Sequence, residues 1–137
     1  DTRTLPWHEL GELYRQAHCF VLPSLGEGWG LTPLEAMACA CPTIVCKFGG
    51  VLEYANDRTA FFAPFTFETE DSQLGPAEGS YTTPAKLART MWKVAKNYPA
   101  AVEQGERAAR FVHERFTWQK VGQRFVENIE AIGWGRA

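Results

Sequence analysis

Two short apolar runs, separated by a glycine-rich turn and a helical segment, limit what this chain can fold into. Residues 18–23 and 43–46 are largely apolar stretches of strand length, and such runs are typical of strands buried on both faces of a parallel sheet. A helix between them must end near Cys41, because Pro42 disfavours a helical conformation at the residue before it. Strand, helix and strand in this order predict an α/β fold with a Rossmann-like parallel sheet.

The same alternation continues on either side of this unit. Apolar side chains recur at helical spacing over residues 6–17, which predicts a helix before the first strand. Residues 51–56 indicate a short helix, and residues 60–62 indicate a third short strand. We therefore assign residues 1–65 to the βαβ part of the domain.

The character of the sequence changes after residue 65. Residues 66–83 are polar and contain Gly-Pro and Gly-Ser steps, so we expect a long polar loop there. Three helical stretches follow within residues 84–137, and we assign them to C-terminal helices of the same domain. The last one presents an apolar stripe from Trp118 to Ile132, which is typical of a helix that faces a core.

The segment between the first strand and the following helix carries the most information about function. Thr32 and Glu35 have the spacing of a capping box, in which the two side chains satisfy free backbone donors at a helix start. The remaining free N–H groups and the helix dipole would favour an anion such as a diphosphate. Gly28 and Gly30 remove side chains that would block close approach to the backbone.

A purely structural interpretation accounts for much of this segment. Capping boxes are common, and Gly-x-Gly before a helix is a weak signal by itself. Glu27 changes the balance, because a carboxylate between two glycines at the mouth of a buried strand has no evident capping or packing role. Carboxylates in such loops are candidates for binding sugar hydroxyls or stabilising developing positive charge. The functional interpretation therefore depends on Glu27.

A longer pattern surrounds the two glutamates. It comprises FVLPS at 20–24, EGWGLTPLEAMA at 27–38, PTIV at 42–45, and the glycines at 49–50 followed by Glu53. This pattern resembles the E-x7-E signature of the retaining GT-B glycosyltransferases of group 1, specifically their C-terminal, nucleotide-sugar-binding domain. The resemblance implies a hexosyl-type enzyme that transfers a sugar from a nucleoside-diphosphate sugar to an acceptor. Members of this group generally need no metal ion, so we expect no cofactor besides the donor substrate.

The resemblance also implies roles for individual residues. Glu27 is expected at the donor sugar as the candidate catalytic group, and Glu35 at the ribose hydroxyls. Backbone amides are expected near the sugar and the diphosphate. The predicted nucleotide-sugar-binding residues are Gly28, Trp29, Gly30, Leu31, Thr32 and Glu35.

Several features depart from the family pattern. Ala40 stands where glycine is common at the end of the helix, and Leu52 stands where proline is common. The chain begins at Asp1 without Met, and the strands that normally precede residue 18 are absent, so we expect a fragment whose partner is the missing N-terminal part of the same enzyme. We expect this chain alone to be inactive, and to form a homodimer or a domain swap through the exposed edge of the strand at 18–23.

The distribution of charged residues and cysteines limits the kinds of ligand and cellular location to expect. Residues 1–80 hold 4 Lys and Arg against 11 Asp and Glu, whereas residues 81–137 hold 10 against 5. The acidic first half argues against nucleic-acid binding, and the four cysteines form no C-x-x-C pair and are expected to be reduced. We expect a cytoplasmic location, with peripheral contact to a membrane left open by the basic second half.

Two other functions stay open: a non-catalytic nucleotide or nucleotide-sugar-binding module, and a structural fragment that binds no ligand.

Overall fold

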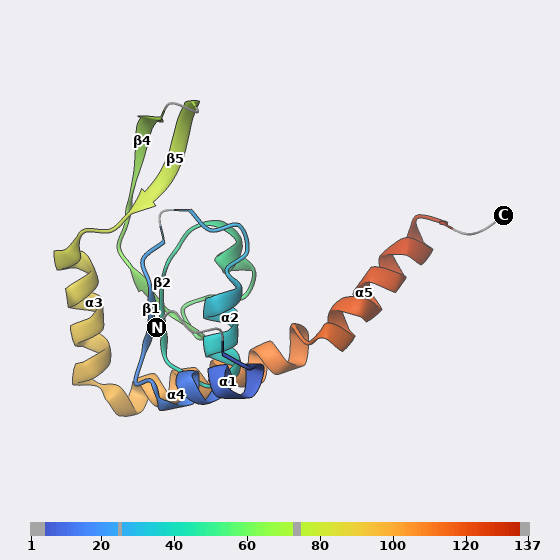
Figure 1. The fold of residues 1–137 in the computed structure, drawn as a ribbon, viewed down its shortest axis with the longest axis horizontal. Helices are drawn as coiled ribbons and strands as arrows, with labels where there is room; N and C mark the ends of the chain where they lie inside the picture. The colour runs from blue at the N-terminus through green and yellow to red at the C-terminus, as the bar shows by residue number, and fades with distance from the viewer. Residues whose placement is uncertain (1–4, 25, 73–74, 135–137) are drawn as a thin grey trace.

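The computed structural model describes residues 5–24, 26–72 and 75–134 (Figure 1). The chain forms two small sheets and a set of helices. In order, the elements are α1 Trp7–Gln16, β1 Phe20–Leu22, α2 Leu31–Ala38, β2 Thr43–Cys46, the 3₁₀ helix η1 Gly49–Glu53, β3 Phe61–Ala63, β4 Thr66–Ser72, β5 Gly75–Tyr81, α3 Pro84–Lys96, α4 Tyr98–Arg115 and α5 Trp118–Ala131.

The first sheet is the predicted Rossmann-like unit. Its order is β1-β2-β3 and both pairings are parallel. The central strand β2 is buried along its whole length, as its apolar sequence predicts. The edge strand β1 is only half-buried, so the prediction of burial on both faces is correct for β2 and wrong for β1. The physical reason is that β1 pairs on one side only among the described residues.

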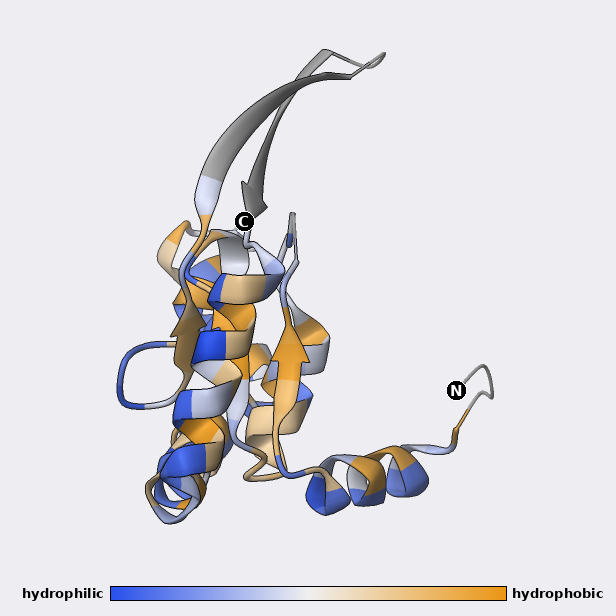
Figure 2. Cartoon of the chain, turned by 90° about the vertical axis from the view of Figure 1, so that its left-hand side faces the viewer, coloured by the Kyte–Doolittle hydropathy of each residue, from blue (hydrophilic) through white to orange (hydrophobic). Residues whose placement is uncertain are grey.

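Helices cover both faces of this sheet. Successive side chains of a strand point to opposite faces, and the neighbours Ile44 and Val45 are 0% and 1% exposed. Val45 packs in a cluster with residues of α2, η1 and α4, whereas Ile44 packs with residues of β3, α3 and α4. In Figure 2 the strands carry the hydrophobic colour and the helices show mixed faces. The core therefore lies in two layers around β2.

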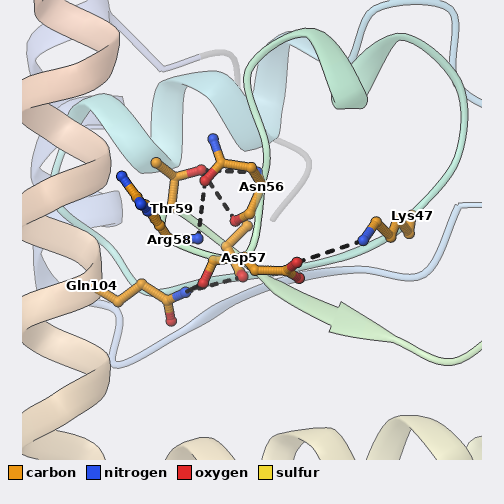
Figure 3. Close-up of polar contacts among 7 residues, drawn as sticks. Lys47, Asn56, Asp57, Arg58, Thr59 and Gln104 are labelled. Atoms are coloured by element: carbon orange, nitrogen blue, oxygen red, sulfur yellow. Dashed lines mark hydrogen bonds and ion pairs between the residues drawn. The ribbon is translucent and has the colours of Figure 1, made fainter.

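The last part of the connection from β2 to β3, residues 56–60 after η1, is held by polar contacts (Figure 3). The side-chain amide of Gln104, on α4, donates hydrogen bonds to the carbonyl oxygens of Asp57 and Ala60 at 3.1 and 3.0 Å. Within the turn, the Asn56 side chain accepts from the Arg58 amide at 2.9 Å. Gln104 therefore gives two carbonyl groups of this turn a hydrogen-bond donor and ties the turn to α4.

Residues 66–83 do not form the polar loop that their composition suggested. β4 and β5 form an antiparallel hairpin in which Thr66 pairs with Tyr81 and Ser72 with Gly75. The Gly-Pro step that suggested a loop lies inside β5, with Pro76 opposite Asp71. Apart from Phe67 the residues of β4 are polar, so no alternation of apolar and polar side chains predicted this strand.

The three C-terminal helices are confirmed, but the apolar stripe of α5 is not part of the core. α5 extends away from the sheet in Figure 1, and none of its residues is buried. Trp118 is 89% exposed and Phe125 is 65% exposed. The stripe was expected to be covered, and none of the described elements covers it.

The turn between α2 and β2 keeps a left-handed residue although that residue is not glycine. Ala40 has a φ of 59°, which is the conformation that glycine adopts most easily at this position of a helix end. Gly105 of α4 packs directly on this turn, where a Cβ would collide with the Ala40 carbonyl oxygen. The turn therefore has a left-handed conformation with alanine where glycine is common in the family.

We predict that Ala40→Gly stabilises the protein. A left-handed conformation costs a residue with a Cβ roughly 1–2 kcal/mol, and the extra freedom of glycine in the unfolded chain removes about 0.4–1 kcal/mol of that gain. The free energy of unfolding should rise by about 0.5–1 kcal/mol. Urea denaturation followed by circular dichroism measures the change.

Ala88→Gly is the matched control, because Ala88 is exposed within α3 and has ordinary helical geometry. It should lower the free energy of unfolding by roughly 0.5–1 kcal/mol. A similar loss of stability in both variants would contradict the prediction.

Candidate functional site

The predicted site lies where the parallel strands end. β1 and β2 run side by side, so their C-terminal ends meet at one edge of the sheet. The loop after β1 and the Gly49–Gly50 turn after β2 leave the sheet there. Glu27 is half-buried and lines a small depression together with Ser24 and Phe48. This is the crevice in which open α/β sheets commonly bind ligands.

Helix α2 starts two residues earlier than the sequence predicted, and the capping box does not form. Its N-cap is Gly30, with a φ of 81° and no side-chain hydrogen bond to the helix start. Thr32 therefore lies inside the first turn instead of capping it. Glu35 does not reach back to the helix start but accepts a hydrogen bond from Tyr14 at 3.1 Å. The prediction of a Thr32–Glu35 capping box is wrong.

Gly30 has two structural reasons to be glycine. Its positive φ is unfavourable for other residues. In addition, a Cβ there would lie 2.8 Å from a methyl group of Val51 and 3.1 Å from Cγ of Glu27. Gly28 differs, because a Cβ at that position would meet nothing within 4 Å. The lack of a side chain at Gly28 is therefore not required by the packing of the described residues.

The Gly49–Gly50 turn packs backbone-to-backbone against the loop that carries Glu27. The Gly50 amide donates to the Glu27 carbonyl oxygen at 3.4 Å. A Cβ on Gly49 would lie 2.5 Å from that same oxygen, and one on Gly50 would lie 2.7 Å from Cα of Trp29 and collide with the Gly28 carbonyl oxygen. Contact this close is available only to glycine.

Tyr54 supports the loop that carries Glu27 through a buried side chain, a role that was not predicted from the sequence. Its side chain is 1% exposed, and its hydroxyl donates a short hydrogen bond to the Gly30 carbonyl oxygen. Its ring packs against Trp29 and Phe116 at centroid distances of 5.9 and 6.2 Å. Burial, and next the nearby charge of Glu27, raise the pKa of Tyr54, so the hydroxyl stays protonated and keeps donating. A buried tyrosine hydroxyl usually has a hydrogen-bond partner, but the mixed sequence around Tyr54, with exposed Leu52 and Glu53, does not predict its burial.

The carboxylate of Glu27 receives no hydrogen bond from any side chain or amide in the described part of the chain. The backbone oxygen of Glu27 fixes the loop, but its side chain takes no part in that contact. Lys47 does not approach it as a partner: its ammonium lies 3.6 Å from Asp57 and 5.0 Å from the centre of the Phe62 ring. Glu27 is thus a half-buried carboxylate whose position follows from the backbone around it.

The other predicted binding residues lie along an open surface at the start of α2. Gly28, Leu31 and Thr32 are exposed, and Trp29 is 41% exposed. The amides of Leu31 and Thr32 belong to the first turn of the helix and have no intrahelical acceptor. Pro33, which has no N–H group, is buried behind them. The structure brings Glu27 and these amides together, and it places Glu35 one turn further along, against α1.

A comparison with known protein families shows to which family this chain belongs. The model for "Glycosyl transferases group 1" matches residues 2–72, just over half of the chain. The chain belongs to this family. The resemblance predicted from the two glutamates is therefore confirmed.

Individual relatives agree with this assignment. A sucrose synthase from Acidithiobacillus caldus is 30% identical over 131 residues, which are 92% of this chain and 15% of that protein. An alpha-maltose-1-phosphate synthase from Mycolicibacterium smegmatis is 28% identical over 90% of this chain and 30% of its own length. A mannosylfructose-phosphate synthase from Agrobacterium fabrum is 31% identical over 89% of this chain and 24% of its own length. The chain thus spans less than a third of each of these relatives.

Solved structures share the fold. A sucrose-phosphate synthase from Thermosynechococcus elongatus superposes with a TM-score of 0.71 and 22% identity, over 93% of this chain and 29% of that one. The Anabaena protein HepE in complex with UDP-glucose superposes with a TM-score of 0.69 and 17% identity, over 90% of this chain and 30% of that one. These values confirm the Rossmann-like α/β fold of the GT-B proteins.

Two further observations concern only the residues that the structure describes. No helix among them is long and apolar enough to cross a membrane. No three His, Cys, Asp or Glu side chains within the same ranges gather as ligands for a metal ion.

We predict that Gly50→Ala lowers the free energy of unfolding by about 1–3 kcal/mol, because the new methyl group would push two backbone segments apart. Chemical denaturation measures this loss. Gly26→Ala, in the facing loop that carries Glu27, is the matched control, since a Cβ there meets nothing within 4 Å. Equal stability of the two variants would show that the two loops are not in contact.

Proposed function

We propose that this chain is the donor-binding part of a retaining glycosyltransferase that transfers a sugar from a nucleoside-diphosphate sugar to an acceptor. The observation that carries the proposal is the half-buried Glu27 carboxylate, which the described residues leave without a hydrogen-bond donor at the C-terminal edge of the sheet. A carboxylate can accept several hydrogen bonds, and the hydroxyl groups of a polyhydroxylated ligand could donate them. Family membership and the UDP and UDP-glucose named for the solved HepE structures support this choice of ligand.

The proposed roles follow the chemistry of the bond that breaks. Departure of the nucleoside diphosphate leaves negative charge on the phosphate and positive charge on the sugar. The amides of Gly30, Leu31 and Thr32, with the helix dipole behind them, would stabilise the phosphate charge. Glu27, with the Gly28 and Trp29 amides, would hold the sugar and stabilise its charge. Glu35 would bind the ribose hydroxyls.

We further propose that catalysis requires a part of the enzyme outside this chain. The support is the coverage of 15–30% of the first relatives' lengths, and the acceptor site would lie in that other part. The alternative, a non-catalytic nucleotide-sugar-binding module, shares the donor site and differs only in turnover. Transfer or hydrolysis of a sugar nucleotide by the isolated chain would overturn the proposed need for a further part.

Calorimetric titration separates the roles of the two glutamates. UDP-glucose, GDP-mannose and ADP-glucose are titrated beside UDP, GDP and ADP. We expect Glu35→Ala to weaken both the preferred sugar nucleotide and its nucleoside diphosphate by roughly 10–100-fold, the usual effect of losing hydrogen bonds to a charged group. Glu27→Ala should weaken only the sugar nucleotide, because its proposed contacts are to the sugar.

Glu106→Ala is the matched control, since Glu106 is exposed on α4. Its affinities should equal those of the unaltered chain. Failure of all six ligands to bind at millimolar concentration would overturn the proposal and favour a structural fragment. Unchanged affinity in both the Glu27 and Glu35 variants would place the ligand elsewhere.

A further inference from the structure

Glu35 is held from its buried side by a single hydroxyl group. Tyr14 lies on α1 and is 8% exposed. Its hydroxyl donates to Oε2 of Glu35 at 3.1 Å. Of the described residues, Tyr14 is the one whose side chain donates a hydrogen bond to this carboxylate. The hydrogen bond therefore joins two helices at a predicted ligand-binding group.

The ring of Tyr14 is itself fixed by packing. It meets the ring of Phe20 edge-on at a centroid distance of 5.8 Å, and it belongs to a buried cluster with Ala36 and Cys41. A tyrosine has only two side-chain torsions, so a packed ring places its hydroxyl with little loss of conformational entropy on ligand binding. The position of the donor is thus determined before any ligand arrives.

The opposite side of Glu35 is open. Glu35 lines a groove that residues of α2 and α5 form together with Trp7 at the start of α1, and Tyr14 is not among the residues that line it. A carboxylate can accept several hydrogen bonds, so the contact with Tyr14 leaves capacity for donors arriving from the groove. The two hydroxyls of a ribose are donors of this kind.

We propose that Tyr14 is a positioning residue that orients the Glu35 carboxylate for the ribose hydroxyls of the bound nucleotide. This inference rests on the proposed function, because it takes the nucleotide as the ligand of Glu35. Tyr14 touches no ligand itself and acts only through the hydrogen bond to Oε2. Burial, and next the hydrogen bond to Glu35, raise the pKa of Tyr14, so its hydroxyl remains a donor throughout the neutral pH range.

An interhelical contact with a purely structural role would predict something different. It would stabilise α1 against α2, and its loss would weaken every ligand of the site equally. A positioning role predicts that the loss depends on the ribose hydroxyls. Tyr14→Phe tests this, because it removes one oxygen atom and keeps the ring that packs on Phe20.

The experiment compares UDP with 2′,3′-dideoxy-UDP by calorimetry; the matching GDP and ADP pairs are used in the same way if one of those nucleotides binds more tightly. Tyr14→Phe should weaken UDP roughly 5–20-fold, in keeping with a hydrogen bond to a charged group, and change the dideoxy nucleotide less than twofold. In a Glu35→Ala background the same change should have no further effect, because Tyr14 acts through Glu35. Tyr98→Phe is the control, since Tyr98 packs in a different cluster.

A second measurement uses the unaltered chain and does not depend on the folding of a variant. With tyrosine labelled at Cζ, the Tyr14 carbon signal should shift on addition of UDP and stay in place with the dideoxy nucleotide. The positioning role would be overturned if both nucleotides shifted the Tyr14 signal equally. It would also be overturned if Tyr14→Phe weakened both nucleotides equally or weakened neither. In each of these cases the proposed function would remain intact. Failure of the unaltered chain to bind any of the three nucleotides would overturn the proposed function, and the role of Tyr14 with it.

Discussion

The geometry of the candidate site depends on the contact between two glycine-containing loops. Because β1 and β2 are adjacent and parallel, the chain leaves both strands at the same edge, and the two loops compete for the same space. Gly49 and Gly50 allow the two loops to pack in contact, since a Cβ on either residue would collide with backbone atoms of residues 27–29. The buried Tyr54 hydroxyl adds a further contact by donating a hydrogen bond to the Gly30 carbonyl oxygen at the start of α2. The direction in which Glu27 and the first amides of α2 point follows from these contacts.

The sequence predicted the parts of the fold that depend on local pattern. Fully buried strands such as β2 have to be apolar on both faces, and a helix must end before Pro42, so the βαβ unit could be derived from residues 18–46 alone. The hairpin could not be derived in this way. Its strands are polar, and its glycines and proline lie within β5, where they give a loop signal. Pairing between two segments compensates for weak local preference, and this compensation is visible only in three dimensions.

The apolar stripe of α5 shows a different limit. A stripe at helical spacing indicates that one face of a helix was selected for contact, but it does not identify the element in contact. Here Trp118 and Phe125 are largely exposed among the described residues, as is Trp92 on α3. Amphipathicity therefore predicted the three helices correctly and the packing of the last one incorrectly.

The two glutamates, which the sequence presented as one motif, are held in different ways. Glu35 was expected to satisfy its own helix start, but Gly30 occupies the N-cap and the carboxylate is free to accept from Tyr14 instead. The backbone oxygen of Glu27 accepts a hydrogen bond in the loop contact. Its side chain makes no hydrogen bond to the described residues. The loop is thus fixed by glycine packing and not by the carboxylate it presents. A carboxylate held in this way can be half-buried without a partner among the described residues, because the surrounding backbone, and not the side chain, provides the stability of the loop.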